Sequence, residues 1–168
     1  GLHSRRYFDE RMRSEFAFAN RHGSPLALLL IDVDHFKRVN DERGHQIGDI
    51  TLCEIALRLL SAARANDMVA RFGGEEFAIL CPATSETEAV TFAERLHKLI
   101  ADPISAPSGA PLRITVTVGI AIAPSAGFKS DADVVKAADV ALYAGKAAGR
   151  DRTEVFDVES PALERAEG

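Results

Sequence analysis

Leu26-Ala27-Leu28-Leu29-Leu30-Ile31-Asp32-Val33-Asp34, residues 26–34, is the most apolar stretch of the chain until its last positions, where two carboxylates appear. The run follows a proline and is short for a helix, which is typical of a buried central strand. Carboxylates at the C-terminal edge of such a strand lie where α/β sheets usually bind ligands. The stretch therefore predicts the centre of a sheet and the position of a site.

Helical and strand-like patterns follow one another along the rest of the chain. The apolar spacing predicts helices at 4–21, 36–41, 50–65, 86–100 and 131–148. Ser4 and Asp49 are expected to cap the first and third of these helices. Residues 44–48 are expected to form a loop bounded by glycines. Strands are expected at 26–33, 68–72, 76–80, 112–123 and 153–156.

The predicted order is α-β-α-α-β-β-α-β-α-β. Gly73 and Gly74 separate two short strands and predict a hairpin, since glycine accepts the positive φ that such turns need. A hairpin is antiparallel, so the sequence predicts an α/β (α+β) fold. Its central sheet is mixed, mostly antiparallel and flanked by helices.

Length and composition indicate one domain. The chain has 168 residues, of which 46% are hydrophobic and 27% charged, close to one domain of about 150 residues. We expect the domain at residues 1–157 and an acidic, frayed tail at 158–168. Cys53 and Cys81 are expected to be reduced thiols of a cytoplasmic protein. A net charge of −5 excludes a generally basic DNA or RNA binder, and no apolar run approaches the roughly 20 residues of a membrane span.

The acidic strand end indicates a cation site. Asp32 and Asp34 are two residues apart, so on a regular strand they share a face. Close carboxylates repel each other unless a cation or proton lies between them, and hard oxygen ligands suit Mg²⁺ or Mn²⁺. The alternative is a strand-end loop with solvated acids.

The hairpin turn Gly73-Gly74-Glu75-Glu76 is the second concentration of polar residues. Two glycines allow a tight turn and the close approach of a ligand. Glu75 and Glu76 should point to opposite faces, so only one of them can readily join Asp32. The alternative is an exposed hairpin with solubilising charges.

Gly73-Gly74-Glu75-Glu76-Phe77 resembles the signature of GGDEF domains, the diguanylate cyclases, in its GGEEF form. Four further motifs resemble the family's in the same order and at similar spacing, so the likeness spans residues 1 to about 156. They are Gly1-Leu2 with Arg5-Arg6-Tyr7-Phe8, Asp32-Val33-Asp34-His35-Phe36-Lys37, Asn40-Asp41 with Gly44-His45 and Gly48-Asp49, and Ala141-Leu142-Tyr143 with Lys146 and Gly149-Arg150.

This resemblance implies a fold like that of class III nucleotide cyclases and polymerase palm domains. It also implies an enzyme that joins two GTP molecules into cyclic di-GMP and releases two pyrophosphates. Each protomer of a homodimer would hold one GTP and two divalent cations, Mg²⁺ or Mn²⁺. The chemistry is then two-metal phosphoryl transfer.

Site residues follow from the same resemblance. Asp32 and Glu75 would bind the metals with help from the Val33 carbonyl, and Glu75 or Glu76 would help to deprotonate the attacking hydroxyl. The shared face of the strand favours Asp34 as the partner of Asp32. The resemblance instead favours Glu75 and leaves Asp34 a supporting role near the site. The alternative for Asp34 is ordinary hydrogen bonding.

Nucleotide recognition is assigned in the same way. Asn40 and Asp49 match the family's guanine-reading pair, and a carboxylate can accept hydrogen bonds from guanine N1–H and the 2-amino group, which adenine lacks. For Asp49 the alternative is a plain helix cap. The phosphate-binding candidates are Phe36, Lys37, Lys146 and Arg150. Lys146 and Arg150 are four residues apart and are expected on one helix face. The alternative interpretation of this pair is a solvated basic helix end.

Arg64-Ala65-Asn66-Asp67 lies nine residues before Gly73 and resembles the RxxD element of the family's product-inhibition site. Arg95 matches an arginine of the same site. The resemblance implies that cyclic di-GMP binds there and suppresses turnover. The alternative is an ion pair at a helix end.

The competing hypothesis is a receptor domain of the same fold that binds GTP or cyclic di-GMP without catalysis. In either case the resemblance implies a bacterial, cytoplasmic domain. A sensor or regulatory domain, with any membrane anchor, is expected to precede it in the full-length protein.

Overall fold

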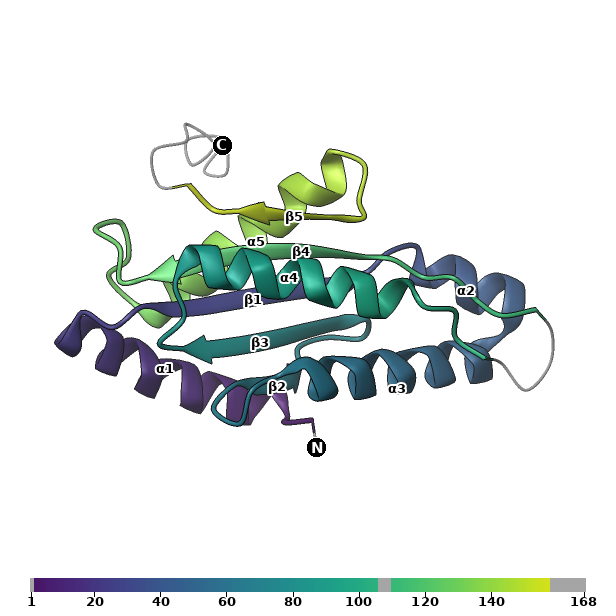
Figure 1. The fold of residues 1–168 in the computed structure, drawn as a ribbon, viewed down its shortest axis with the longest axis horizontal. Helices are drawn as coiled ribbons and strands as arrows, with labels where there is room; N and C mark the ends of the chain where they lie inside the picture. Colours follow the sequence, from purple (N-terminus) through teal and green to yellow (C-terminus); the bar gives the residue numbers. More distant parts are fainter. Residues whose placement is uncertain (1, 106–109, 158–168) are drawn as a thin grey trace.

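The computed structural model describes residues 2–105 and 110–157. Helices and strands alternate in the predicted order, so that prediction is confirmed (Figure 1). Gly1 and the predicted acidic tail at 158–168 lie outside the described residues. The elements are α1 (Arg5–His22), β1 (Leu26–Val33), α2 (Phe36–Arg43), α3 (His45–Ala62), β2 (Met68–Arg71), β3 (Glu76–Pro82), α4 (Glu86–Ala101), β4 (Val116–Ala123), α5 (Asp131–Ala147) and β5 (Arg152–Val155).

The strands form one mixed sheet with the order β2-β3-β1-β4-β5. The pairs β2–β3, β3–β1 and β1–β4 are antiparallel, and only β4–β5 is parallel. Strand β1 is therefore central, as its apolar sequence predicts. Near its C-terminal end Asp32 is in register with Glu76 of β3 on one side and Thr117 of β4 on the other.

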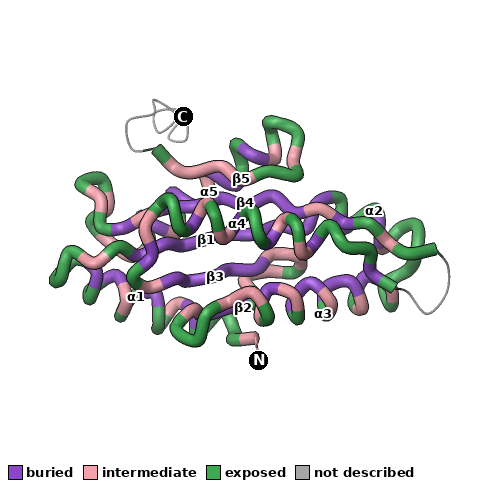
Figure 2. The backbone as a smooth tube through the Cα atoms, in the orientation of Figure 1, coloured by how far each residue is buried: buried purple, intermediate pink, exposed green. Residues whose placement is uncertain are grey.

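Helices cover both faces of this sheet. Alternate residues of β1 point to opposite sides, so Leu29 and Ile31 pack with α2, α3 and α4, whereas Leu28 and Leu30 pack with α1 and α5. Figure 1 shows α4 and α5 on opposite sides of the sheet, and the inner strands are buried along most of their length (Figure 2). Among the described residues no helix is long and apolar enough to cross a membrane.

Local sequence signals fix most helix ends. Ser4 Oγ accepts a hydrogen bond from the Tyr7 N–H at 3.3 Å and caps α1, as predicted. Gly23 ends that helix in the left-handed conformation, with φ 64°, which glycine adopts without strain. Capping boxes begin α4 at Ser85 and α5 at Ser130, where two otherwise unpaired backbone groups are satisfied reciprocally.

The predicted loop at residues 44–48 and the predicted cap at Asp49 are wrong. Helix α2 continues to Arg43, and α3 begins directly after Gly44, whose φ of 86° breaks the helix on its own. Gly48 lies inside α3 because it faces α2 closely: a Cβ there would collide with the Asn40 side chain. The sequence therefore does not distinguish a glycine that allows close helix packing from a glycine that bounds a loop.

Several other boundaries differ from prediction, among them the end of α3, which lies at Ala62 and not near residue 65. The strand expected at 112–123 begins only at Val116, because the backbone of Leu112 is hydrogen-bonded instead to that of Ile104, at 2.8 and 2.9 Å. Helix α5 ends at Ala147, so Arg150 is not on the same helix face as Lys146. Arg150 lies in the turn that follows.

Helix α5 packs against β4 at a glycine. Gly119 is buried under this helix, and a Cβ there would collide with the Ala138 carbonyl oxygen and the Leu142 amide nitrogen. Since backbone atoms of a packed helix cannot move aside cheaply, the position requires glycine. This contact sets how closely α5 approaches the sheet at Ala138 and Leu142.

Gly119→Ala should lower the free energy of unfolding by about 2–3 kcal/mol, because the methyl group forces α5 away from β4. Urea denaturation measures the change. Gly74→Ala is the matched control: nothing lies within 4 Å of its Cβ position, so its stability should stay within about 0.5 kcal/mol of the starting protein. Equal losses in the two variants would contradict the packing argument.

Candidate active site

The C-terminal end of β1 carries a buried carboxylate paired with a lysine. Asp32 is 6% exposed, and its Oδ2 lies 2.8 Å from Lys146 Nζ at the end of α5. Burial raises the pKa of Asp32, although the charges of Lys146 and Arg150 oppose the shift. The sheet thus holds an acid that favours a cationic neighbour, since a buried carboxylate is stable only when paired.

Backbone and side-chain hydrogen bonds hold the turn between β2 and β3. The N–H groups of Phe72 and Gly73 donate to the Glu76 carbonyl at 2.8 and 3.1 Å, and the Arg71 guanidinium donates to the Gly73 and Gly74 carbonyls. The antiparallel hairpin is as predicted, but the reason given for its glycines is wrong. Neither adopts a positive φ; instead a Cβ at Gly73 would press on the Glu76 carboxylate.

The backbone of both acids of this turn lies near the C-terminal end of β1. The Val33 N–H donates to the Glu75 carbonyl at 3.2 Å, and Glu76 is the cross-strand neighbour of Asp32. Burial, and next the charge of Asp32, raise the pKa of Glu75. The expectation that only one of the two glutamates readily joins Asp32 stays a prediction: the charge of Asp32 acts on Glu75, whereas the Glu76 carboxylate lies at Gly73.

The donor set fits a hydrated divalent cation. Among the residues that the structure describes, no group of three or more histidine, cysteine or acidic side chains forms a ready metal cage. Mg²⁺ commonly binds through one or two carboxylates together with waters and substrate phosphates. Asp32, Glu75 and the Val33 carbonyl match that pattern, and the raised pKa values of Asp32 and Glu75 indicate carboxylates that a cation would stabilise.

The predicted guanine-binding residues lie where α2 packs on α3. The Asn40 amide oxygen lies against Gly48, the residue that precedes Asp49. Asp49 is an exposed residue within the first turns of α3. The two side chains thus come from different helices to neighbouring positions.

The phosphate-binding candidates occupy different environments. Phe36 is 7% exposed in the core beneath α2, so only its backbone is available to a ligand, while Lys37 is exposed. Arg150 is in a turn in which Gly149, Arg150 and Asp151 all have positive φ, at 116°, 66° and 47°. This turn keeps Arg150 close enough to act on the pKa of Asp32.

The Asp34 carboxylate is satisfied by hydrogen bonds from the protein, although its charge still raises the pKa of Asp32. Its carboxylate is 3% exposed and accepts hydrogen bonds from the Thr115 hydroxyl at 2.7 Å, the Thr117 hydroxyl at 2.6 Å and the Asp151 N–H at 3.0 Å. Sequence reasoning missed these partners. The pattern Thr115-Val116-Thr117 was a usable signal, because alternation places both hydroxyls on one face.

The family model described as diguanylate cyclase, GGDEF domain, matches residues 1–152. The chain belongs to this family. Diguanylate cyclase DgcP of Pseudomonas aeruginosa is 44% identical over 155 residues, and the response regulator PleD of Caulobacter vibrioides is 40% identical over 152 residues. These matches cover 92% and 89% of this chain but 23% and 33% of the relatives, so the chain spans a third or less of their length.

A solved GGDEF domain confirms the fold. The crystal structure of the GGDEF domain of DgcB from Caulobacter crescentus, in complex with c-di-GMP, has a TM-score of 0.87 at 32% identity. The match covers 92% of this chain and 91% of that one. This GGDEF domain therefore has the palm-like α/β fold that its sequence predicts.

Two of the three predicted inhibitory-site residues of the GGDEF domain, Arg64 and Arg95, line a pocket of about 200 Å³ between α4 and the end of α3. Arg64, Phe92 and Arg95 line it, and the Arg95 guanidinium donates to the Ala62 carbonyl at 2.7 Å and lies 5.0 Å from the Phe92 ring centre. Asp67 is not among the lining residues. Its carboxylate instead accepts from the Arg64 N–H at 2.7 Å.

That pocket is cationic in character. Its acid, Glu88, belongs to the capping box of α4, where hydrogen bonds from Ser85 hold the pKa of Glu88 below its ordinary value. Behind it, burial and the Asp67 carboxylate raise the pKa of the Cys81 thiol. Two guanidinium groups beside an aromatic ring suit a ligand with flat rings and negative charge.

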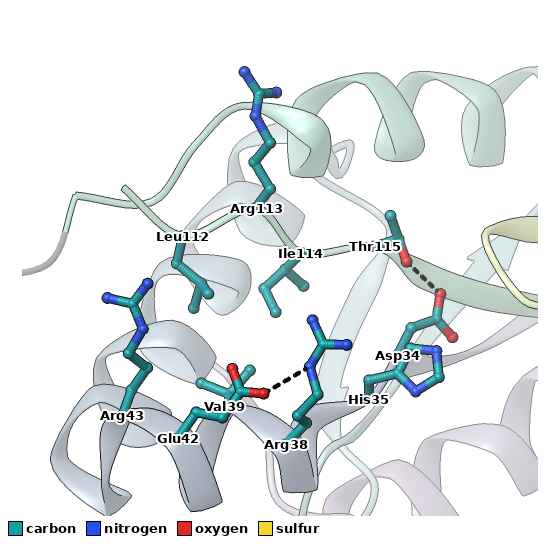
Figure 3. Close-up of a pocket in the computed structure, with 10 residues that line it drawn as sticks. All are labelled: Asp34, His35, Arg38, Val39, Glu42, Arg43, Leu112, Arg113, Ile114 and Thr115. Atoms are coloured by element: carbon teal, nitrogen blue, oxygen red, sulfur yellow. Dashed lines mark hydrogen bonds and ion pairs between the residues drawn. The ribbon is translucent and has the colours of Figure 1, made fainter. Parts of the chain in front are cut away.

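Another hollow, of about 220 Å³, lies between α2 and residues 112–115 and includes Asp34 in its lining. Figure 3 shows that Arg113 extends away from Arg38 and Arg43, and that Arg38 is paired with Glu42. These arginines do not converge on one point. This hollow therefore reaches Asp34 at the strand end, but Asp32, Glu75 and Lys146 are not among its lining residues.

Glu75→Gln should raise the thermal midpoint at neutral pH. Because the pKa of Glu75 is raised in the folded state, its ionised form opposes folding above that pKa, and the effect vanishes below the unfolded value of about 4.3. The gain should therefore shrink as pH falls, in melting curves without divalent cations. Glu94→Gln, at an exposed position of α4, is the control without such a gain. A lower midpoint for Glu75→Gln at neutral pH would contradict this electrostatic assignment.

Proposed function

We propose that this GGDEF domain is a diguanylate cyclase that condenses two GTP molecules into cyclic di-GMP. In each of two steps a ribose 3′-oxygen forms a bond to the α-phosphorus of the other GTP, the bond to pyrophosphate breaks, and the hydroxyl proton passes to a base. The observation that carries the proposal is the meeting of Asp32, Glu75 and Lys146 at one end of the sheet. It occurs in a chain that matches the cyclase domain along most of its length.

The family is generally metal-dependent, and Asp32, Glu75 and the Val33 carbonyl are the proposed ligands for two Mg²⁺ or Mn²⁺ ions. When bound, the cations supply activation of the attacking oxygen and neutralisation of charge on the leaving phosphates. Glu75 and Glu76 are the proposed proton acceptors, because the backbone of both lies near the C-terminal end of β1.

Lys146, Arg150, Lys37 and the backbone of Phe36 are the proposed triphosphate contacts. Lys146 already neutralises Asp32 at 2.8 Å, and the charge of Arg150 acts on the same carboxylate. A lysine point charge and an arginine fork are both suited to phosphate oxygens.

Asn40 and Asp49 are the proposed guanine contacts. Asp49 is not a helix cap in the structure, so its exposed carboxylate is available to accept from guanine N1–H and the 2-amino group. Adenine lacks this pair of donors, and the domain should therefore discriminate against ATP.

The proposed reaction requires two copies of the domain. Each chain supplies one set of these residues, whereas the product contains two guanylate units. Two protomers must therefore bring their GTP molecules face to face in a homodimer. A sensor or regulatory domain elsewhere in the full-length protein is the proposed control over that encounter.

Incubation with GTP and Mg²⁺ should yield cyclic di-GMP, identified by chromatography, with ATP as the unreactive control. The rate per protomer should rise with protein concentration, because the active species contains two chains. Failure to form product at high concentration while GTP still binds would contradict the cyclase proposal. It would favour the receptor hypothesis.

We further propose that the pocket lined by Arg64 and Arg95 binds cyclic di-GMP as an inhibitor. The two guanidinium groups and Phe92 offer stacking and edge contacts to guanine. Asp67 holds the backbone of Arg64 at 2.7 Å and thereby fixes where this side chain begins. Product that binds best to an unproductive arrangement must lower turnover.

Arg64→Ala should raise the cyclic di-GMP concentration for half-inhibition about tenfold or more, since a charge-assisted contact to guanine is lost. Initial rates at increasing product concentration measure the effect. Arg21→Ala, on the opposite face of the sheet in α1, removes the same charge and should leave the inhibition curve unchanged. Identical curves for the starting protein and Arg64→Ala would exclude this pocket as the inhibitory site.

A further inference from the structure

The backbone after α5 is held in a demanding conformation. Gly149, Arg150 and Asp151 have consecutive positive φ values of 116°, 66° and 47°. Glycine accepts this region freely and aspartate tolerates it, but arginine does so only when its surroundings hold it there. The Arg150 N–H donates to the Gly145 carbonyl at 3.0 Å, which closes the helix end but does not tie the turn to the sheet.

Asp34 makes that tie. Its Oδ2 accepts from the Asp151 N–H at 3.0 Å, across 117 positions of sequence. The Thr115 and Thr117 hydroxyls, at 2.7 and 2.6 Å, orient the same carboxylate from β4 and the residues just before it. With 3% exposure, the group is held in one orientation by these neutral donors.

The other side of the turn faces α4. His97 of α4 lies 3.8 Å from the Asp151 carboxylate through Nδ1 and 3.0 Å from the Thr153 hydroxyl through Nε2. Asp151 is thus held at its N–H by Asp34, and its side chain lies near His97 of α4. The residue between Asp151 and Gly149 is Arg150, the proposed phosphate contact.

We propose that Asp34 is a positioning residue for the reaction: by holding the Asp151 N–H it aims Arg150 at the nucleotide triphosphate. This inference rests on the proposed function of the site. In it Asp34 neither binds a metal nor transfers a proton. Asp34 fixes the position of the turn that carries Arg150 relative to the acidic end of β1. In this proposal the two Asp residues of the strand end have different partners. Asp32 binds cations, and Asp34 holds the backbone next to Arg150.

A double-mutant cycle on nucleotide affinity tests the proposal without turnover. The probe is guanosine 5′-(α,β-methylene)triphosphate with Mg²⁺, titrated calorimetrically against the whole chain, and GMP is the second probe. Asp34→Ala should weaken the triphosphate about tenfold, the scale of one hydrogen bond to a charged group, and GMP less than about twofold. In the Arg150→Ala background, Asp34→Ala should add less than about twofold, because its effect passes through Arg150.

Conservative and matched variants sharpen the test. Asp34→Asn keeps a carbonyl oxygen for the Asp151 N–H and should restore affinity to within about threefold of the starting protein. Asp139→Ala, which removes an exposed acid from α5, should not change affinity. Losses that multiply in the double variant, unchanged affinity in Asp34→Ala, or no rescue by asparagine would each overturn the proposal.

If Asp34→Ala does not fold, hydrogen exchange of the starting chain decides the matter. The Asp151 amide, on an exposed residue, should exchange at least about tenfold more slowly than an unprotected amide if the bond to Asp34 holds it. Free exchange at Asp151 would overturn the proposal. Absence of cyclase activity in the starting chain, by contrast, would count against the proposed function and leave this binding result standing.

Discussion

Burial of β1 on both faces and both edges is the constraint on which the rest of the structure depends. The strand is hydrogen-bonded to β3 and β4 along its length, so its register places Glu76 and Thr117 beside Asp32. Because the interior around Leu28, Leu29 and Ile31 is closely packed, the strand cannot shift without moving every polar group at its end. A rigid apolar element thus positions a charged site.

The acidic residues at the C-terminal end of β1 differ in what stabilises their carboxylates. Burial raises the pKa of Asp32 and of Glu75, so both carboxylates gain from a nearby cation, and Lys146 supplies one for Asp32. Asp34 is different, since the Thr115 and Thr117 hydroxyls and one backbone N–H satisfy it. Neighbouring acids of similar sequence context therefore have different partners: Asp32 is paired with a cationic side chain, whereas Asp34 is held by hydrogen bonds within the fold.

Helix α4 links the two proposed nucleotide sites. Arg95 lines the pocket beside Arg64. Two residues later, His97 contacts Asp151 and Thr153, next to the turn that carries Arg150. One helix therefore contacts both the proposed inhibitory site and the turn that carries Arg150. This connection is consistent with a domain in which product binding and catalysis are regulated together.

The sequence by itself determined the order of elements, the central strand, the hairpin and the family, because periodicity, caps and five ordered motifs are local signals. It did not determine that Gly48 lies within a helix, that the fourth strand starts at Val116, or that Arg150 leaves α5. These depend on close packing and on backbone bonds between distant residues. Only the tertiary structure decided that Asp34 holds the Asp151 N–H, since that bond spans 117 positions and leaves no periodic trace.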